Sequence, residues 1–310
     1  MLSDYAAFSA EFPWFFPLAA FLFGLCVGSF LNVVIYRVPK NESVVFPGSH
    51  CGCGGPIAWY DNIPILSWLL LRGRARCCGR PFSFRYPFVE LLTGTLFLAS
   101  WIQYPPLVAL GGCIFLSALI AATFIDLDHM IIPDLFTIGL GVLGVMLSFA
   151  IPALHGFAGD EFMVDSLRAG GASIIGLFIG SALVLWIALI AEALLRKEAM
   201  GFGDVKFVGA IGAFCGWQGA VFALFGGAVV GTVWFTLAKL LQLARPPRLI
   251  AAPAWLEPES TERAGFAGES SLAFGAHVPF GPMLAIAGAL YFLAFRKPML
   301  SWLADMGQLF

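Results

Sequence analysis

The sequence predicts an all-α, polytopic membrane protein of about eight transmembrane helices, with a cytoplasmic loop subdomain after the first helix. Of its 310 residues, 60% are hydrophobic and 12% are charged, whereas about 25% of residues are charged in an ordinary soluble domain. The mean hydropathy is +0.88. Apolar runs of about 20 residues, the length that crosses a bilayer, recur along the chain. These observations exclude an ordinary soluble domain, and the formal net charge of −2 gives no support to nucleic-acid binding.

The predicted helices follow from hydropathy. The run IIGLFIGSALVLWIALIAEALL is the clearest, because its one charge, Glu192, lies near its end. The N-terminal stretch MLSDYAAFSAEFPW has no basic residue before the first apolar run, so it lacks the signature of a signal peptide and the first helix is expected to be retained. The predicted transmembrane helices cover residues 14–36, 87–103, 105–125, 131–152, 170–195, 205–218, 219–243 and 278–295.

Basic residues orient the chain, because cytoplasmic loops carry an excess of Lys and Arg. The basic residues of the first long loop are Arg37, Lys40, Arg72, Arg74, Arg76, Arg80 and Arg85. We therefore expect this loop in the cytoplasm and the N-terminus outside. The sequence then divides into an N-terminal transmembrane helix (1–36), a cytoplasmic cysteine-containing loop domain (37–86) and a transmembrane domain with the candidate catalytic residues (87–310).

Two segments place aspartates at predicted helix ends. The segment ATFIDLDHMIIPDLFTIGL has Asp126 and Asp128 at the end of the third helix, and GFGDVK has Asp204 at the start of the sixth. Gly201 and Gly203 precede Asp204, and glycine adopts backbone conformations that other residues avoid. Both helix ends are cytoplasmic in the predicted topology. We therefore expect Asp126 and Asp204 to face one another across a shallow cleft within the membrane.

Two facing carboxyl groups can share one proton, because burial and like charge keep one of them protonated while the other is ionised. The ionised group can take a proton from water as a general base, and the protonated group can polarise a scissile carbonyl. The motifs HExxH, GxSxG and GxxxxGK[ST] do not occur in the sequence. Two other interpretations stay open from the residues alone: helix capping by each aspartate, or a proton-coupled transporter in which the aspartates carry protons.

Five motifs in a fixed order resemble the type IV prepilin peptidases, a family of bifunctional leader peptidases and N-methyltransferases. They are GSFLNVVIYRVP, WYDNIPILSWLLLRGR with RYPFVELLTG, DLDHMIIPD, GFGDVK and VPFGP. The resemblance extends over about residues 24–295. It implies a GxGD-type intramembrane aspartyl protease, so that 87–310 is the peptidase domain.

The resemblance implies that Asp126 and Asp204 are the catalytic pair. Asp128 is the rival for the first position, and Asp126 is preferred because the family's first aspartate stands seven residues before a proline, here Pro133. The implied substrates are prepilins and pseudopilins, cut at the cytoplasmic face of the bacterial inner membrane after the glycine of a short basic leader. S-adenosylmethionine would then methylate the new N-terminal residue. A peptidase that has lost methyl transfer is the alternative.

Four further residues are candidates for supporting roles. Lys206 either turns toward Asp204 and biases the ionisation of the pair, or extends to the membrane interface. Glu90 is an ionisable group in the second helix, for which a functional role and a capping role are both open. The family's methyltransferase function has been placed in the first loop, which makes Gly73 and Arg74 of LRGRAR candidates by position, although a glycine and an arginine also suit a turn.

Four cysteines gather in the first loop: Cys51, Cys53, Cys77 and Cys78. A cytoplasmic loop is reducing, so a structural zinc site is expected in preference to disulfides. The spacing is irregular, because the fuller members of the family show two C-x-x-C pairs and this chain shows C-G-C and C-C, with Ala75 where a third cysteine is expected. Zinc and free thiols both stay open.

Overall fold

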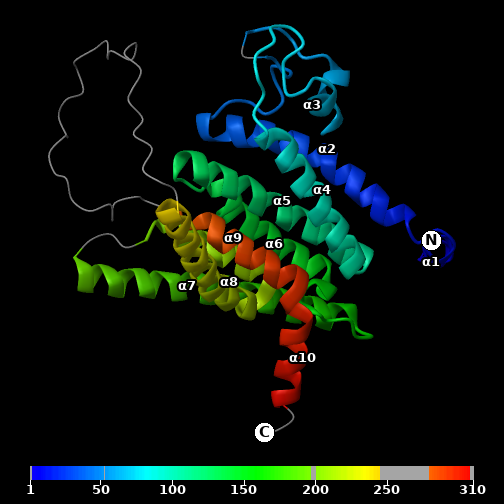
Figure 1. Cartoon of the computed structure of the whole chain (residues 1–310). Coiled ribbons are helices and arrows are strands. Elements are labelled where there is room, and N and C mark those ends of the chain that lie inside the picture. Colours follow the sequence, from blue (N-terminus) through cyan, green and yellow to red (C-terminus); the bar gives the residue numbers. More distant parts are fainter. Residues whose placement is uncertain (1, 52, 197–199, 245–278, 308–310) are drawn as a thin grey trace.

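The computed structural model describes residues 2–51, 53–196, 200–244 and 279–307, which form a bundle of helices with a smaller loop subdomain beyond one end of it (Figure 1). Every regular element in these ranges is helical. Two isolated β-bridges, His50 with Pro56 and Arg74 with Pro81, lie in the loop subdomain. The all-α prediction is confirmed.

The helices follow one another closely along the chain. The longer ones are α1 (Leu2–Glu11), α2 (Phe15–Arg37), α4 (Arg85–Gln103), α5 (Pro106–His129), α6 (Ile138–Ala150), α7 (Phe162–Leu195), α8 (Phe202–Ala244), α9 (Gly281–Leu290) and α10 (Arg296–Gly307). The short ones are α3 (Leu66–Leu70) and the single turns Val38–Lys40, Trp59–Asn62, Asp134–Phe136 and Pro152–His155, with a π-helical stretch at Tyr291–Phe295 between α9 and α10.

Five helical stretches in the described part of the chain are long and apolar enough to cross a bilayer: Phe15–Lys40, Pro106–His129, Phe162–Leu195, Phe202–Leu240 and Gly281–Trp302. This confirms a polytopic membrane protein. The other predicted segments, 87–103 and 131–152, correspond to α4 and to the shorter α6. The count of eight membrane passages stays a prediction.

Helix α8 consists of two arms that fold back on each other at Gly216. This residue has φ 72° and ψ 177°, a conformation that is almost restricted to glycine. A Cβ atom on Gly212 would lie 3.2 Å from the Cβ of Ala220, although eight residues of straight helix span about 12 Å. A Cβ atom on Gly180 of α7 would lie 2.8 Å from the carbonyl oxygen of Val208 and 3.0 Å from the Cβ of Ala220, so both arms pack against the same point of α7. The predicted segments 205–218 and 219–243 therefore correspond to the two arms of a helical hairpin.

Two helices start at residues that differ from the first residues of the predicted transmembrane runs. Helix α6 starts at Ile138 instead of residue 131, because α5 ends with Met130 in the left-handed conformation (φ 54°) and Pro133 precedes the short turn Asp134–Phe136. Helix α7 starts at Phe162 instead of residue 170. Its first two turns contain polar residues such as Asp165, which a hydropathy window excludes although they are helical.

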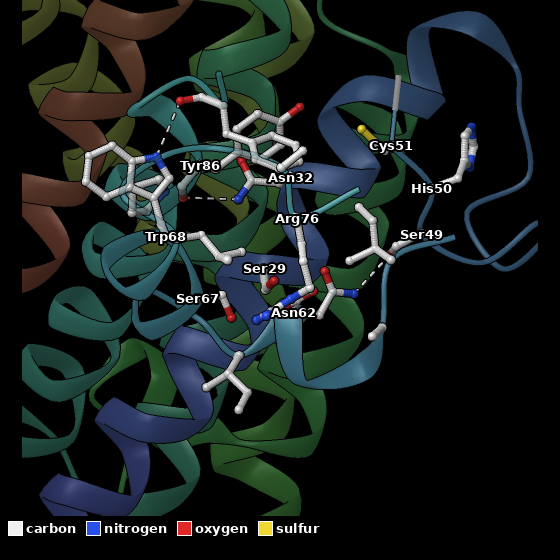
Figure 2. Close-up of a pocket in the computed structure, with 18 of the residues that line it drawn as sticks. Ser29, Asn32, Ser49, His50, Cys51, Asn62, Ser67, Trp68, Arg76 and Tyr86 are labelled. Atoms are coloured by element: carbon white, nitrogen blue, oxygen red, sulfur yellow. Dashed lines mark hydrogen bonds and ion pairs between the residues drawn. The ribbon is translucent and has the colours of Figure 1, made fainter. Parts of the chain in front are cut away.

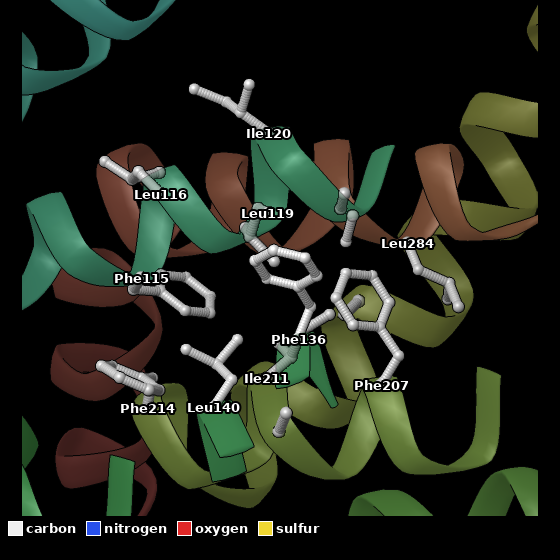
Figure 3. Packing of buried hydrophobic residues seen from close by; sticks show 14 of the residues in the cluster. Phe115, Leu116, Leu119, Ile120, Phe136, Leu140, Phe207, Ile211, Phe214 and Leu284 are labelled. Atoms are coloured by element: carbon white, nitrogen blue, oxygen red, sulfur yellow. The ribbon is translucent and has the colours of Figure 1, made fainter. Parts of the chain in front are cut away.

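The buried core lies among α5, α6, α8 and α9 (Figure 3). The rings of Phe115 on α5 and Phe214 on α8 stack with their centroids 4.9 Å apart. Ile211 packs against α9, where a Cβ on Gly288 would lie 3.3 Å from it. This core holds in place the ends of α5, α8 and α9 that carry the candidate site.

The loop subdomain is tied to α2 and α4 by two side chains. Arg37, at the end of α2, donates hydrogen bonds to the carbonyl oxygens of Ser43 (2.9 Å) and Pro47 (2.8 Å). Glu90 on α4 accepts a hydrogen bond of 2.7 Å from the backbone N–H of Ile65. Hydrogen bonds that involve a charged partner are stronger than neutral ones. The loop is thereby held at the end of the bundle where α2 ends and α4 begins.

Candidate active site

Asp126 lies near the end of α5 and is buried, with 5% of its surface exposed. Its Oδ2 atom accepts a hydrogen bond of 3.1 Å from the backbone N–H of Gly281, the first residue of α9. A Cβ atom on Gly281 would lie 2.5 Å from the same oxygen. The carboxylate therefore occupies the space that a side chain at Gly281 would need, and the start of α9 fixes its position.

Gly281 is a site residue that the sequence analysis missed. The signal for it was present, because VPFGP is one of the five ordered motifs and Gly281 is its glycine. The sequence distance between Gly281 and Asp126 is 155 residues, so the motif alone did not indicate which group the glycine meets.

Asp204 lies in the first turn of α8, half-buried, and its backbone N–H donates to the carbonyl oxygen of Gly201 at 3.0 Å. Ile132 lies close to the chain around both aspartates. A Cβ on Gly203, which precedes Asp204, would lie 3.7 Å from Ile132, and a Cβ on Gly281, which contacts Asp126, would lie 2.9 Å from it. The structure thus brings the two predicted aspartates together from different helices.

No hydrogen bond supports the interpretation of these aspartates as helix caps. In the ranges that the structure describes, neither the Asp126 nor the Asp204 carboxyl accepts a hydrogen bond from an amide in the first turn of its own helix. Asp126 stands at the carboxyl end of α5, where no free N–H groups are exposed. Neither carboxyl group is therefore engaged in capping its own helix.

Asp128 is turned away from this pair. Its two carboxylate oxygens accept hydrogen bonds of 2.8 Å and 2.7 Å from Arg85 at the start of α4, and Arg85 also donates to the carbonyl oxygen of Phe124 at 3.2 Å. Asp128 and Arg85 are 37% and 32% exposed. This ion pair joins the ends of α4 and α5, and it leaves Asp126 as the aspartate that meets Asp204.

Lys206 does not contact Asp204. Its ammonium group forms an ion pair with Asp134, in the turn that precedes α6. The expectation that Gly201 and Gly203 use conformations special to glycine was wrong, because neither has a positive φ. A Cβ on Gly203 would make only ordinary contacts.

A cavity of about 550 Å³ lies between the loop subdomain, α2 and α4 (Figure 2). Its walls include Asn32, Trp68 and Arg74, and neither candidate catalytic aspartate is among them. Gly73 has φ +67°, and a Cβ there would lie 3.1 Å from the indole of Trp68. Of the two positions singled out in the loop, Arg74 therefore lines this cavity, and Gly73 packs against Trp68, which lines it.

Glu90 also lines this cavity. The carboxylate is buried, with 8% of Glu90 exposed, and it holds Ile65, which has φ 60°. A positive φ is strained for a β-branched residue. Glu90 therefore stabilises the cavity wall, and it makes no contact with the aspartate pair.

The four loop cysteines converge, and their Sγ atoms all lie within 4.8 Å of one another. The Sγ atoms of Cys51 and Cys78 are 3.6 Å apart, and those of Cys53 and Cys77 are 3.4 Å apart. Tetrahedral zinc with Zn–S bonds of about 2.3 Å requires sulfur atoms about 3.8 Å apart. The Gly55 amide and the Cys77 thiol lower the pKa of Cys53 to about 7. The donor set fits a zinc ion, and Cys77 takes the place expected for a cysteine at position 75.

The fold and the paired carboxyl groups define a class: a helical membrane protein with the two-carboxylate arrangement that aspartyl proteases use. The chain belongs to the type IV leader peptidase family, whose model matches residues 113–236. A model of the bacterial peptidase A24 N-terminal domain matches residues 22–104. The resemblance seen in the motifs is confirmed.

Curated relatives agree with this family. A Klebsiella pneumoniae protein named prepilin leader peptidase/N-methyltransferase is 40% identical over 219 residues, which are 68% of this chain and 90% of the relative. The Aeromonas hydrophila protein of the same name is 35% identical over 306 residues, 89% of this chain and 90% of the relative. The Myxococcus xanthus protein of that name is 42% identical over 227 residues, 70% of this chain and 64% of the relative. No solved structure matches the chain.

Proposed function

We propose that this protein is an intramembrane aspartyl peptidase that removes the leader of type IV prepilins and pseudopilins with Asp126 and Asp204. One observation carries the proposal: Ile132 lies against both Gly281, which holds the buried Asp126 carboxylate, and Gly203, which directly precedes Asp204 on α8. The names of the curated relatives support the substrate class.

The two carboxyl groups work as a pair that shares one proton. The ionised member takes a proton from a water molecule, whose oxygen attacks the scissile carbonyl. The protonated member donates a hydrogen bond to the carbonyl oxygen as negative charge develops there. A proton then passes to the leaving amine, which becomes the N-terminus of the mature pilin. Gly281 keeps the Asp126 carboxylate in position through its N–H group.

The substrate and the site meet at the edge of the membrane. A prepilin carries an apolar helix that lies in the bilayer, and its leader precedes that helix. The aspartate pair lies at the ends of α5 and α8, next to the exposed ion pairs of Asp128 and Asp134. The basic loop at the same end supports a cytoplasmic position for the site, with the N-terminus outside and the chain in the bacterial inner membrane. The division at residues 36 and 86 belongs to the same proposal.

N-methylation of the new N-terminus is the second proposed activity, supported by the relatives' names. S-adenosylmethionine, when bound, would supply the methyl group: its methyl–sulfur bond would break as the carbon–nitrogen bond forms, releasing S-adenosylhomocysteine and a proton from the amine. In the loop, Cys51, Cys53, Cys77 and Cys78 would hold a zinc ion, and its role would be structural, because four thiolates fill a tetrahedral site and leave no position for a substrate.

The test is leader cleavage of a prepilin in membranes, comparing Asp126→Asn, Asp204→Asn and Asp128→Asn at equal expression. The first two variants should lose cleavage and the third should keep it, because Asp128 is engaged with Arg85. Cleavage by Asp204→Asn at the wild-type rate would refute the mechanism. Incorporation of a labelled methyl group into the cleaved pilin separates the bifunctional enzyme from a peptidase alone, and substrate flux without cleavage would indicate a transporter.

A further inference from the structure

The short helix α3 has an exposed apolar side. Leu66 lies three residues before Leu69 and four before Leu70, so these side chains share one side of the helix and form its leucine face. They are 49%, 58% and 73% exposed. Trp68 and Leu71 point to the opposite side, where they line the cavity between the loop subdomain, α2 and α4. Helix α3 therefore forms part of the cavity wall with one side and presents the leucine face outward.

Glu90 fixes the level of α3 along the bundle. Its carboxylate accepts a hydrogen bond of 2.7 Å from the backbone N–H of Ile65, the residue directly before α3. Glu90 itself packs against Gly28 of α2, where an added Cβ would lie 2.7 Å from the Glu90 Cα. From Gly28 to the end of α2 at Arg37 is a distance of about 13 Å along the helix axis. Helix α3 therefore begins beside α2, well short of the end of that helix.

This level of α2 lies within the bilayer. The helical stretch Phe15–Lys40 has 26 residues and the hydropathy of a membrane span. It is about 39 Å long, close to the roughly 40–45 Å of a bilayer with its headgroups. At its end the Lys40 ammonium lies 3.3 Å from the centroid of the Tyr36 ring, and such residues mark the membrane–water interface. The level of Gly28, about 13 Å further in, is therefore below the headgroups.

The surroundings of the leucine face also suit a lipid surface. The Phe84 ring lies 5.7 Å from the Trp68 ring and 6.4 Å from the Phe88 ring on α4, between centroids. Phe84 and Phe88 are 64% and 44% exposed, so the exposed apolar surface of α3 continues onto α4. Residues 62–84 contain no Asp or Glu and four arginines, a charge that matches anionic headgroups: Arg72, Arg74, Arg76 and Arg80.

We propose that α3 is embedded in the lipid leaflet on the side of the loop subdomain, with Leu66, Leu69 and Leu70 in contact with acyl chains. Amphipathic helices bury their apolar side by about 5–10 Å at the boundary between headgroups and acyl chains, and the level set by Glu90 corresponds to that boundary. Because the other side of α3 lines the cavity, the embedded helix separates the cavity from the lipid. The inference goes beyond the proposed peptidase activity and does not depend on it.

The first test uses the wild-type protein, so it does not depend on the folding of a variant. The purified full-length chain is reconstituted into vesicles of phosphatidylethanolamine and phosphatidylglycerol that contain a lipid with a diazirine on its acyl chain. After irradiation, mass spectrometry locates the lipid adducts. Phe30 of α2 is the internal reference, because it is 51% exposed and lies two residues from Gly28. We expect adducts on the leucine face as well as on Phe30. Adducts on Phe30 and none on the leucine face would overturn the proposal.

A second measurement distinguishes lipid from a protein partner. The photoreactive residue p-benzoylphenylalanine replaces Leu70 or, as the matched control, Phe46, and both variants are irradiated in the same vesicles without prepilin. Phe46 is 76% exposed and Leu70 73%, but Phe46 lies at the end of α2, because Arg37 bonds the carbonyl oxygens of Ser43 and Pro47 on either side of it.

The Leu70 variant should gain the mass of a lipid at the size of one chain, and the Phe46 variant should not. Cross-linking of the Leu70 probe to a second copy of the chain, or equal lipid adducts at both positions, would overturn the proposal. Since no prepilin takes part in either measurement, such a result would leave the proposed peptidase activity as it stands.

Discussion

Replacing Gly281 with alanine should remove the Asp126 carboxylate from its place without changing any carboxyl group. The added Cβ atom would lie 2.5 Å from Asp126 Oδ2 and 2.9 Å from Ile132. Oxygen and carbon cannot approach so closely, so the carboxylate must move. Because Asp126 accepts the Gly281 N–H at 3.1 Å, this movement also breaks the hydrogen bond that holds it.

The size of the effect follows from that hydrogen bond. A hydrogen bond to a charged group contributes about 1.5–3 kcal/mol. If the carboxylate holds this position in the transition state, its loss raises the barrier by a similar amount. A change of about 1.4 kcal/mol is tenfold in rate, so cleavage should fall by a factor of about 10 to about 150. Misplacement of a catalytic group by about 1 Å leads to a similar factor.

The assay is the initial rate of prepilin leader cleavage in membranes at equal enzyme expression. Gly288→Ala is the matched control on the same helix, because a Cβ there meets Ile211 at 3.3 Å, in the core and away from the aspartates. We expect the control to cleave within about threefold of the wild type. If Gly281→Ala cleaves as fast as the wild type, the start of α9 does not position Asp126, and the reasoning from this contact is refuted.

Three further predictions concern the fold, the flanking ion pair and the metal. Gly216→Ala should lower the free energy of unfolding by about 1–3 kcal/mol in chemical denaturation, because alanine rarely adopts the positive φ of Gly216. Gly171→Ala is the control, because a Cβ there would enter open space, and it should leave the stability unchanged. Equal stabilities of the two variants would argue against the hairpin. Lys206→Met should change cleavage by less than about threefold, since the ion pair of Lys206 with the exposed Asp134 is screened by water and does not include Asp204; a loss of cleavage would show that Lys206 acts on the aspartate pair. Cys51→Ser should reduce the zinc content of the purified protein, and a metal content equal to that of the wild type would contradict the zinc site.

Hydropathy was sufficient to predict the membrane class and most of the helices. A segment that crosses a bilayer needs about 20 apolar residues, and this requirement acts on each segment independently of the others. Helix starts were less accurate where a proline or a polar turn adjoins the apolar run, as at α6 and at the first turns of α7. The local sequence does not determine whether a polar residue next to an apolar run belongs to the helix.

The aspartates were found because their motifs are short and local, but their partners were not. Asp128 and Asp126 are separated by one residue and have the same chemistry in the sequence. The structure distinguishes them, because Asp128 bonds to Arg85 while Asp126 meets Gly281. Lys206 likewise binds Asp134, a partner 72 positions away. Contacts between distant helices depend on how the helices pack, which no single motif contains.

The cysteines are a second case in which the sequence alone did not decide which side chains meet. Their irregular spacing weakened the case for a metal site, yet the loop brings all four Sγ atoms within 4.8 Å. Spacing constrains ligands only through the backbone between them, and Gly54 and Gly79, which directly follow the two cysteine pairs, both adopt a positive φ that suits a tight turn. The sequence by itself determined the membrane class, the family and the chemistry available. Only the tertiary structure decided which of these groups meet, because side-chain contacts across the bundle join residues that the chain order keeps far apart.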